Sequence, residues 1–311
     1  MTLEEKKLYN EELKERFLKQ YTGNTQKYYR NILQKAFPIE TALKKDIYAF
    51  NRSELNELFA EFGATSELSI ISEVSIIRKY IDFFAGFVDT KTNWAATYSP
   101  KDLKRYVNKF AMRKKYITTF EQYYKNILEL NNAQDGALIA LIYEGARGKE
   151  EIEEIQNLKI TDVFPNDNKV ILTRNNGDTR ELIVEDDTME LIKDAIAEKE
   201  YYKNNGQDCD VTINFLPLAN SEYVFRPCGK TKTGKLKQQT LLRRIKNIAN
   251  YWGNPYINVR NIWVSGMIKY AKELKKQYGK LTMPECWLIC DKFGYDRRYW
   301  YNVTRWTRDY I

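Results

Sequence analysis

The sequence predicts a two-domain protein that is mainly α-helical, with a small antiparallel β-sheet in the second domain. A chain of 311 residues is longer than one small core needs and suits two domains. Apolar residues recur at helical spacing along most of the chain. Two short β-rich runs, Lys169–Thr173 and Arg180–Val184, flank the turn Asn175-Asn176-Gly177-Asp178, a pattern typical of a hairpin.

Residues 1–90 are predicted to form a small all-helical domain. Thr25 is a suitable N-cap for a helix that Pro38 is expected to end. A longer helix is expected over residues 66–87, because apolar side chains recur there with the spacing of one helical face. These side chains are Leu68, Ile71, Val74, Ile77, Tyr80 and Phe84.

Residues 91–116 are interpreted as a linker that also carries charge. The segment contains Pro100, and its second half is basic with only Asp102 opposing. Such a stretch favours contact with a phosphate backbone, which carries no sequence information by itself. The predicted DNA contacts in this linker are Lys104, Arg105, Arg113, Lys114 and Lys115.

Residues 117–311 are predicted to form the second domain. Thr118 or Thr119 is suited to cap its first helix. The apolar run at 135–143 predicts a buried helix that Gly145 ends. A helix over 150–158 precedes the hairpin, and further helices are expected over 188–202, 239–252, 259–278 and 284–293.

Charge is segregated along the chain. The formal net charge is +8, and no Asp or Glu occurs between Tyr223 and Lys272. An electropositive face of this kind is typical of proteins that bind double-stranded DNA. A solvated basic surface without a partner is the alternative, and a membrane-surface role is disfavoured because neither basic stretch has an apolar stripe. The predicted contacts here are Arg226, Lys230, Lys232, Lys235, Lys237, Arg243, Arg244 and Arg260.

Within that window, the lysines are expected to position phosphates. Arg243 and Arg244 lie near the start of a predicted helix, from which arginines are able to reach base edges. The alternative for these two arginines is a plain solvated helix face.

Composition excludes several classes of mechanism and site. The chain has no histidine, which excludes histidine-based triads and His-metal sites. Its four cysteines, Cys209, Cys228, Cys286 and Cys290, lack the spacing of a zinc site and are expected to be reduced. We expect no metal and no cofactor. The absence of a long apolar run and of a signal sequence predicts a cytoplasmic protein, at the host nucleoid if it binds DNA.

The order of these elements resembles that of the tyrosine recombinases, or phage integrases. Asn24-Thr25-Gln26-Lys27-Tyr28 is similar to the start of a helix in their core-binding domain. Glu154-Ile155-Gln156-Asn157-Leu158-Lys159-Ile160-Thr161-Asp162-Val163 is similar to a motif of their catalytic domain, and the run 135–145 to its buried helix. The resemblance covers nearly the whole chain. It implies a two-domain clamp around DNA, with a core-binding domain in 1–90 and a catalytic-type domain in 117–311.

The same resemblance implies that the recombination chemistry is lost. The family uses a tyrosine nucleophile, two arginines, a lysine and histidines. Arg260 matches the second arginine, whereas the first falls on Arg147 or Glu151 depending on register, and the Glu151 register matches more positions. The nucleophile falls on residues 302–304, with Tyr299, Tyr301 and Tyr310 nearby but off register. Non-catalytic residues occupy the remaining positions: Asn175 for the lysine, and Ile257, Asn261 and Tyr295 for the histidines.

These observations lead to the expectation of a sequence-specific DNA-binding repressor that maintains lysogeny of a temperate phage. The loop from Gly145 to Lys149, followed by the helix through Lys159, resembles integrase-fold repressors of SPbeta-like phages. That resemblance implies oligomerisation on DNA and a small antirepressor or peptide-linked regulator as a partner. An active but divergent recombinase is the first alternative. A DNA-binding architectural protein without sequence preference is the second.

Overall fold

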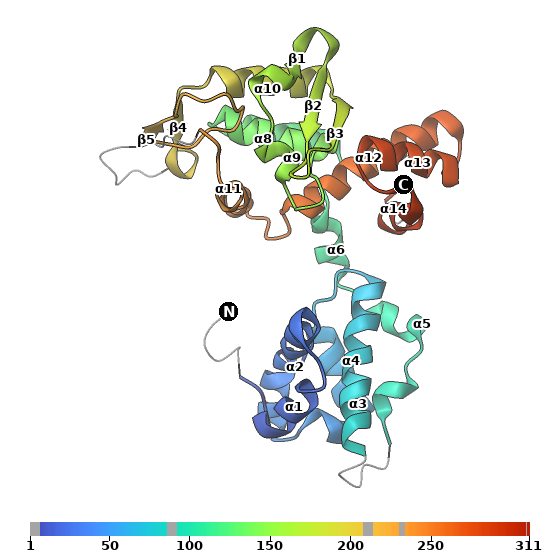
Figure 1. The fold of residues 1–311 in the computed structure, drawn as a ribbon. Helices are drawn as coiled ribbons and strands as arrows, with labels where there is room; N and C mark the ends of the chain where they lie inside the picture. Colours follow the sequence, from blue (N-terminus) through green and yellow to red (C-terminus); the bar gives the residue numbers. More distant parts are fainter. Residues whose placement is uncertain (1–6, 86–91, 208–213, 230–233, 309) are drawn as a thin grey trace. The chain divides into compact units, whose positions relative to one another are not determined.

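The protein consists of two compact units, divided between Arg113 and Lys114. The computed structural model describes residues 7–85, 92–207, 214–229, 234–308 and 310–311. Most described residues are helical, and the strands form small antiparallel sheets, which confirms the predicted fold class (Figure 1).

The first unit packs its helices around a single apolar core. Phe17, Leu33, Leu58 and Tyr80 are fully buried in that core. Its helices are α1 (Glu11–Leu18), α2 (Gly23–Leu43), α3 (Arg52–Glu61), α4 (Glu67–Ala85) and α5 (Pro100–Leu103), with 3-10 turns at Ile47–Ala49, Trp94–Thr97 and Lys104–Tyr106.

Helix α2 runs through Pro38, so the predicted end of the helix at that residue is wrong. A proline inside a helix removes one hydrogen bond and costs about 3 kcal/mol or more. Buried residues lie on both sides of Pro38. Ala36 is part of the core, and Glu40 pairs with the buried Lys14. The packing of this face outweighs the local preference of proline.

The predicted linker over 91–116 is not a separate segment in the structure. Ala95, Tyr98 and Leu103 are buried in the core of the first unit. Arg78 on α4 donates to the carbonyl oxygen of Ala95 at 2.8 Å, and the Tyr98 hydroxyl lies 2.6 Å from Asn56 Oδ1. Apolar side chains placed between the charges therefore dock this stretch, and only α6 (Lys109–Lys115) crosses the division between the units.

The second unit contains the remaining elements. Its first sheet has the order β1-β2-β3, and Thr173 pairs with Thr179 beside the predicted turn. The helices are α7 (Phe120–Leu128), α8 (Ala133–Glu144), α9 (Glu153–Gln156), α10 (Asp186–Ala197), α11 (Gln238–Tyr251), α12 (Val259–Tyr278), α13 (Met283–Lys292) and α14 (Trp300–Thr307), and the strands are β1 (Val163–Phe164), β2 (Lys169–Thr173), β3 (Thr179–Ile183), β4 (Glu200–Tyr202) and β5 (Phe215–Pro217).

A second sheet, formed by β4 and β5, replaces the last turns of the helix predicted over 188–202. The carboxylate of Glu198 accepts hydrogen bonds from the backbone N–H groups of Ala133 and Gln134 at 2.8 and 3.0 Å. These N–H groups begin α8, where a negative charge is favourable. The contact ends α10 at Ala197, where the sequence has no glycine or proline to end the helix.

Helix α8 lies at the centre of the second unit (Figure 1). Every residue from Gln134 to Glu144 is buried. Helix α12 crosses it at Gly266, where a Cβ atom would lie only 1.6 Å from the carbonyl oxygen of Tyr143. Only glycine permits so close an approach. The crossing brings the first turn of α12 near the loop that follows α8.

No helix of the described residues is long and apolar enough to cross a membrane. Within the same residues, no group of three or more Cys, Asp or Glu side chains is arranged to hold a metal ion.

Candidate functional site

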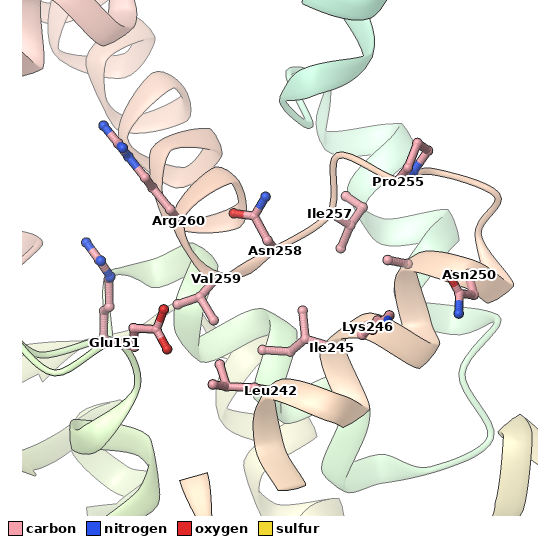
Figure 2. A pocket seen from close by; sticks show the side chains of 12 residues that line it. Glu151, Leu242, Ile245, Lys246, Asn250, Pro255, Ile257, Asn258, Val259 and Arg260 are labelled. Carbon is pink, nitrogen blue, oxygen red and sulfur yellow. The ribbon is translucent and has the colours of Figure 1, made fainter. Parts of the chain in front are cut away.

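A cavity of about 470 Å³ lies in the second unit where three segments meet. The loop after α8 contributes Arg147 and Glu151, and the start of α12 contributes Arg260. Figure 2 shows Leu242, Ile245 and Lys246 of α11 on the opposite wall. The remaining lining residues are Ala249, Asn250, Pro255, Ile257, Asn258 and Val259.

The loop that carries Arg147 is held by a buried carboxylate. Gly145 ends α8 with φ +121°, and the chain turns there toward the cavity. Glu154, which has no exposed side-chain surface, accepts a hydrogen bond from the backbone N–H of Arg147 at 2.9 Å. The position of the Arg147 backbone therefore depends on Glu154.

Two arginines from the hairpin surround the same carboxylate. Arg180 donates to both Glu154 oxygens at 2.9 and 2.7 Å, and Arg174 donates at 3.2 Å. Arg180 also donates to the carbonyl oxygens of Gly145 and Lys292, at 2.8 and 2.9 Å. Burial raises the pKa of Glu154, but the hydrogen bonds and charge of Arg180 outweigh burial and lower it overall. The carboxylate is thus charged and joins the end of α8, the hairpin and the end of α13.

Aromatic rings hold the two arginines of the cavity. The guanidinium of Arg147 lies over the Trp263 ring at 5.0 Å, and that of Arg260 lies over the Trp306 ring at 5.4 Å. The two tryptophans contact each other edge to face, with centroids 6.0 Å apart. A cation over an aromatic face is stabilised without using its N–H donors. Both guanidinium groups therefore keep hydrogen-bonding capacity.

Neither guanidinium group forms a hydrogen bond or an ion pair with a carboxylate of the described residues. Arg147 Nε is buried and has no partner among them. Burial and the charge of Arg260 lower the pKa of Arg147, and the same two causes lower the pKa of Lys115. Like charges are thus held together, an arrangement that an anion would stabilise.

Glu151 is the one acidic residue among those that line the cavity. Its backbone is left-handed, with φ +59°, and its side chain is exposed. The lining has three cationic residues, Arg147, Lys246 and Arg260. With the one acidic residue, Glu151, its formal charge is three minus one, or +2. Both alternatives for the first arginine, Arg147 and Glu151, therefore reach the same cavity, one attracting an anion and the other opposing it.

The other predicted catalytic positions have the following surroundings in the structure. Ile257 is buried and lines the cavity. Asn261 lies outside the lining and donates to the carbonyl oxygen of Tyr256 at 2.8 Å. Asn175 is turned toward the loop before α9, where its Nδ2 donates to Glu150 at 2.6 Å. The neighbouring Arg174 donates to Glu154 at 3.2 Å.

No tyrosine lines the cavity among the residues described. Tyr295 packs against Trp263, with centroids 5.8 Å apart, and its hydroxyl accepts a hydrogen bond from Asn302 at 3.1 Å. Tyr299 and Tyr301 are exposed, and Tyr310 contacts the ring of Tyr116.

Two of the residues predicted to contact DNA, Arg226 and Arg244, have guanidinium groups with structural partners inside the protein. Arg244 is only 4% exposed and donates to Gln134 Oε1 at 2.9 Å. Arg226 donates to the carbonyl oxygens of Ala195 and Ile196 at 3.0 and 3.2 Å. The helical spacing of Leu241, Ile245 and Ile248 defines an apolar side of α11. Arg244 falls on that side and Arg243 does not, so sequence periodicity was a usable signal for their difference.

The structure places the remaining basic residues as follows. In the second unit, Lys237, Arg243 and Lys114 are exposed, while Lys235 and Lys115 are half-buried. In the first unit, Arg113 is exposed, as are Lys104, paired with Glu67 at 3.0 Å, and Arg105, over the Tyr106 ring at 5.0 Å. The predicted contacts Lys230 and Lys232, like Cys209, lie outside the described residues.

Sequence reasoning missed the tryptophans that support the cavity. Trp263 follows Arg260 by three positions on α12, and Trp306 lies on the last helix. The spacing of Arg260 and Trp263 places both residues on one side of α12, but Trp263 stacks on Arg147 and not on Arg260. Trp306 had no signal in its spacing, because it is far from either arginine in sequence.

Comparisons with known proteins agree with this organisation. Residues 116–311 match the family described as MrpR, C-terminal catalytic domain, and residues 8–85 match MrpR, N-terminal core-binding domain. The SPbeta prophage-derived uncharacterized protein YopR of Bacillus subtilis (strain 168) is 24% identical over 310 residues, which cover 98% of this chain and 94% of that protein. The family match confirms the predicted order of a core-binding domain followed by a catalytic-type domain.

Two solved structures are similar at lower identity. The crystal structure of XerA recombinase is 13% identical with a TM-score of 0.43, over 95% of this chain and 93% of that one. The Tn1549 transposon integrase in complex with circular intermediate DNA is 11% identical with a TM-score of 0.46, over 94% of both chains.

We predict that Glu154→Gln lowers the free energy of unfolding by about 3–5 kcal/mol, because two largely buried arginines lose their charged partner. Urea denaturation of the full chain measures this. Glu222→Gln is the matched control, since Glu222 pairs with Lys159 at 2.9 Å on the exposed surface. Loss of this surface ion pair should lower the free energy of unfolding by about 1 kcal/mol or less. Equal effects of the two substitutions would contradict the role given to Glu154.

Proposed function

Because the chain belongs to the MrpR family, we propose that it is a sequence-specific repressor that binds double-stranded DNA of a temperate phage or prophage without cleaving it. The prophage origin of the relative YopR supports the biological setting. One observation carries the proposal. Arg147 and Arg260 meet at a cavity, each stacked on a tryptophan and neither paired with a described carboxylate.

A DNA phosphate is the anion that best suits this cavity. Guanidinium groups bind phosphate oxygens through paired N–H donors, and such charge-assisted hydrogen bonds are strong. Aromatic support holds both side chains in place before binding, which reduces the entropy lost on contact. The exposed cations Lys114, Lys237 and Arg243 add sequence-independent attraction.

Absence of cleavage is proposed from the chemistry that the cavity lacks. A phosphotyrosyl step needs a placed nucleophile, a charge clamp and a proton donor to the leaving oxygen. Ile257 has no proton to give, and the negative Glu151 opposes charge that develops on the phosphate. Arg260 is equally useful for holding an unreacting phosphate. An active recombinase would instead use Arg147, Arg260 and a tyrosine that approaches only when DNA binds.

The proposed regulatory role implies other partners. A small antirepressor or peptide-linked regulator, oligomerisation on DNA and a nucleoid location stay predictions from the family resemblance. They concern surfaces other than the cavity.

We predict that selection from phage and host genomic fragments recovers a discrete operator. In competition at fixed salt, unrelated duplex DNA should displace that operator only at about 10³-fold or greater excess, the range typical of specific binders. Placing the operator upstream of a reporter gene should then give repression that depends on the protein. Equal competition by unrelated DNA would favour the architectural alternative.

We predict that Arg260→Ala weakens operator binding by about 1–3 kcal/mol, because one charge-assisted phosphate contact is lost. The slope of log affinity against log salt concentration should fall by about 1. Fluorescence anisotropy at several salt concentrations measures both quantities.

Two variants control that experiment. Arg297→Ala removes an exposed arginine that already pairs with Asp291, and it should leave both quantities nearly unchanged. Glu151→Gln removes the opposing charge at the cavity and should tighten binding. If Arg260→Ala and Arg297→Ala behaved alike, the cavity would not be a phosphate site.

We predict that nicked suicide DNA gives no covalent protein–DNA adduct, as judged on denaturing gels. Separate Tyr→Phe changes at Tyr299, Tyr301 and Tyr310 should leave operator affinity and repression unchanged, because none of them lines the cavity. A known active tyrosine recombinase with its own substrate is the positive control. An adduct that one of these substitutions abolishes would establish the recombinase alternative.

A further inference from the structure

The cationic cavity of the second unit also has an apolar part. Six of its twelve lining residues have apolar side chains. Figure 2 shows Ile257 and Val259 on one side of the cavity, opposite Leu242 and Ile245 of α11. The full apolar set is Leu242, Ile245, Ala249, Pro255, Ile257 and Val259. The cavity thus combines cations with an apolar wall.

This apolar wall offers surface to a ligand. Leu242 is half-buried and Pro255 is exposed, while Ile245, Ile257 and Val259 are buried and form the deeper part of the lining. A molecule that fills the cavity would cover this surface, and removal of apolar surface from water favours binding. The wall therefore suits a ligand that has an apolar part of its own.

A DNA phosphate accounts for the cations of the cavity but not for its apolar wall. The volume of about 470 Å³ lies within the ~300–1,000 Å³ of pockets that enclose whole small molecules. A phosphate group is much smaller, and its charged oxygens gain nothing from contact with Leu242 or Ile257. DNA binding alone thus leaves part of the cavity unexplained.

The cations select the charge of the ligand. Arg147, Lys246 and Arg260 with Glu151 give the lining its formal charge of +2, which suits one negative group better than a chain of phosphates. Guanidinium groups bind carboxylates through paired N–H donors. Neither arginine is paired with a carboxylate of the described residues, so no internal ion pair has to break when a ligand binds.

From these observations we propose that the cavity also binds a small organic carboxylate with a compact apolar body, and that this ligand competes with DNA. The carboxylate contacts Arg147 and Arg260, and the apolar body lies against Leu242, Ile257 and Val259. Both ligands need the same guanidinium groups, so the bound carboxylate weakens DNA binding by mass action. The competition rests on the proposed phosphate contact, whereas binding of the carboxylate does not.

The probe is 2-naphthoate, titrated into the full-length protein without DNA and followed by calorimetry and ligand-observed NMR. Acetate has the charge without the apolar body, and 2-naphthamide has the body without the charge. We expect saturable binding of 2-naphthoate, at least about tenfold tighter than that of either control, because each control loses one part of the contact. Absence of saturable binding at millimolar concentration would overturn the proposal, and so would equal affinities for 2-naphthoate and either control.

A pair of leucine substitutions locates the site. Leu242→Ala shortens a half-buried residue of the cavity wall and should weaken 2-naphthoate binding at least about fivefold. Leu191→Ala makes the same change on α10, at a half-buried residue that packs against the same core outside the cavity lining, and should leave binding unchanged. Circular dichroism shows whether both variants are folded. Should Leu242→Ala fail to fold, the comparison of the three probes still decides, and equal affinities of two folded variants would refute the assignment.

Competition with DNA tests the regulatory part. Affinity for a labelled operator is measured at constant ionic strength, without ligand and with 2-naphthoate at ten times its Kd. We expect operator affinity to fall at least about fivefold, because the bound ligand removes the phosphate contact of both arginines. Unchanged operator affinity would refute the competition. Failure to recover any operator would instead refute the proposed function, and the titrations without DNA would still decide whether the carboxylate binds.

Discussion

The buried carboxylate of Glu154 is the contact on which the second unit depends most. It binds Arg174 and Arg180 from the hairpin and the backbone of Arg147. Because Arg180 also holds the carbonyl oxygens that end α8 and α13, one charge joins segments from distant parts of the sequence. Removing a buried charge from such a cluster leaves its partners uncompensated, so the network holds its geometry firmly.

Because this network is rigid, Arg147 and Arg260 stay beside the cavity although neither is paired with a carboxylate of the described residues. Arg147 and Arg260 repel each other, yet each rests on a tryptophan rather than on a carboxylate. An anion bound at the cavity would relieve this repulsion. Glu151 limits that gain, because it places a negative charge in the same lining.

Helix α11 separates two cavities of different chemistry. The side that carries Lys246 faces the charged cavity, and the side that carries Asn247 faces a second cavity, lined mainly by amide and tyrosine side chains, with Asn250 bordering both. In sequence, the basic residues of the helix lie close together, at Arg243, Arg244 and Lys246. Its division into a charged and a neutral side follows from the angular positions of these residues, and from the burial of Arg244 beside Asp135.

Long periodic segments were predictable, and α12 begins and ends at the predicted residues because its apolar spacing, N-cap and C-terminal glycine agree. Sequence by itself also determined the net charge, the lack of histidine and the order of domains. Only the tertiary structure decided that α2 continues through Pro38, that 92–107 pack on the first unit, that Arg244 donates to Gln134, and that Arg147 and Glu151 share a cavity with Arg260. Each of these depends on contacts between residues far apart in the chain, whose energies exceed the local preferences that a sequence reveals.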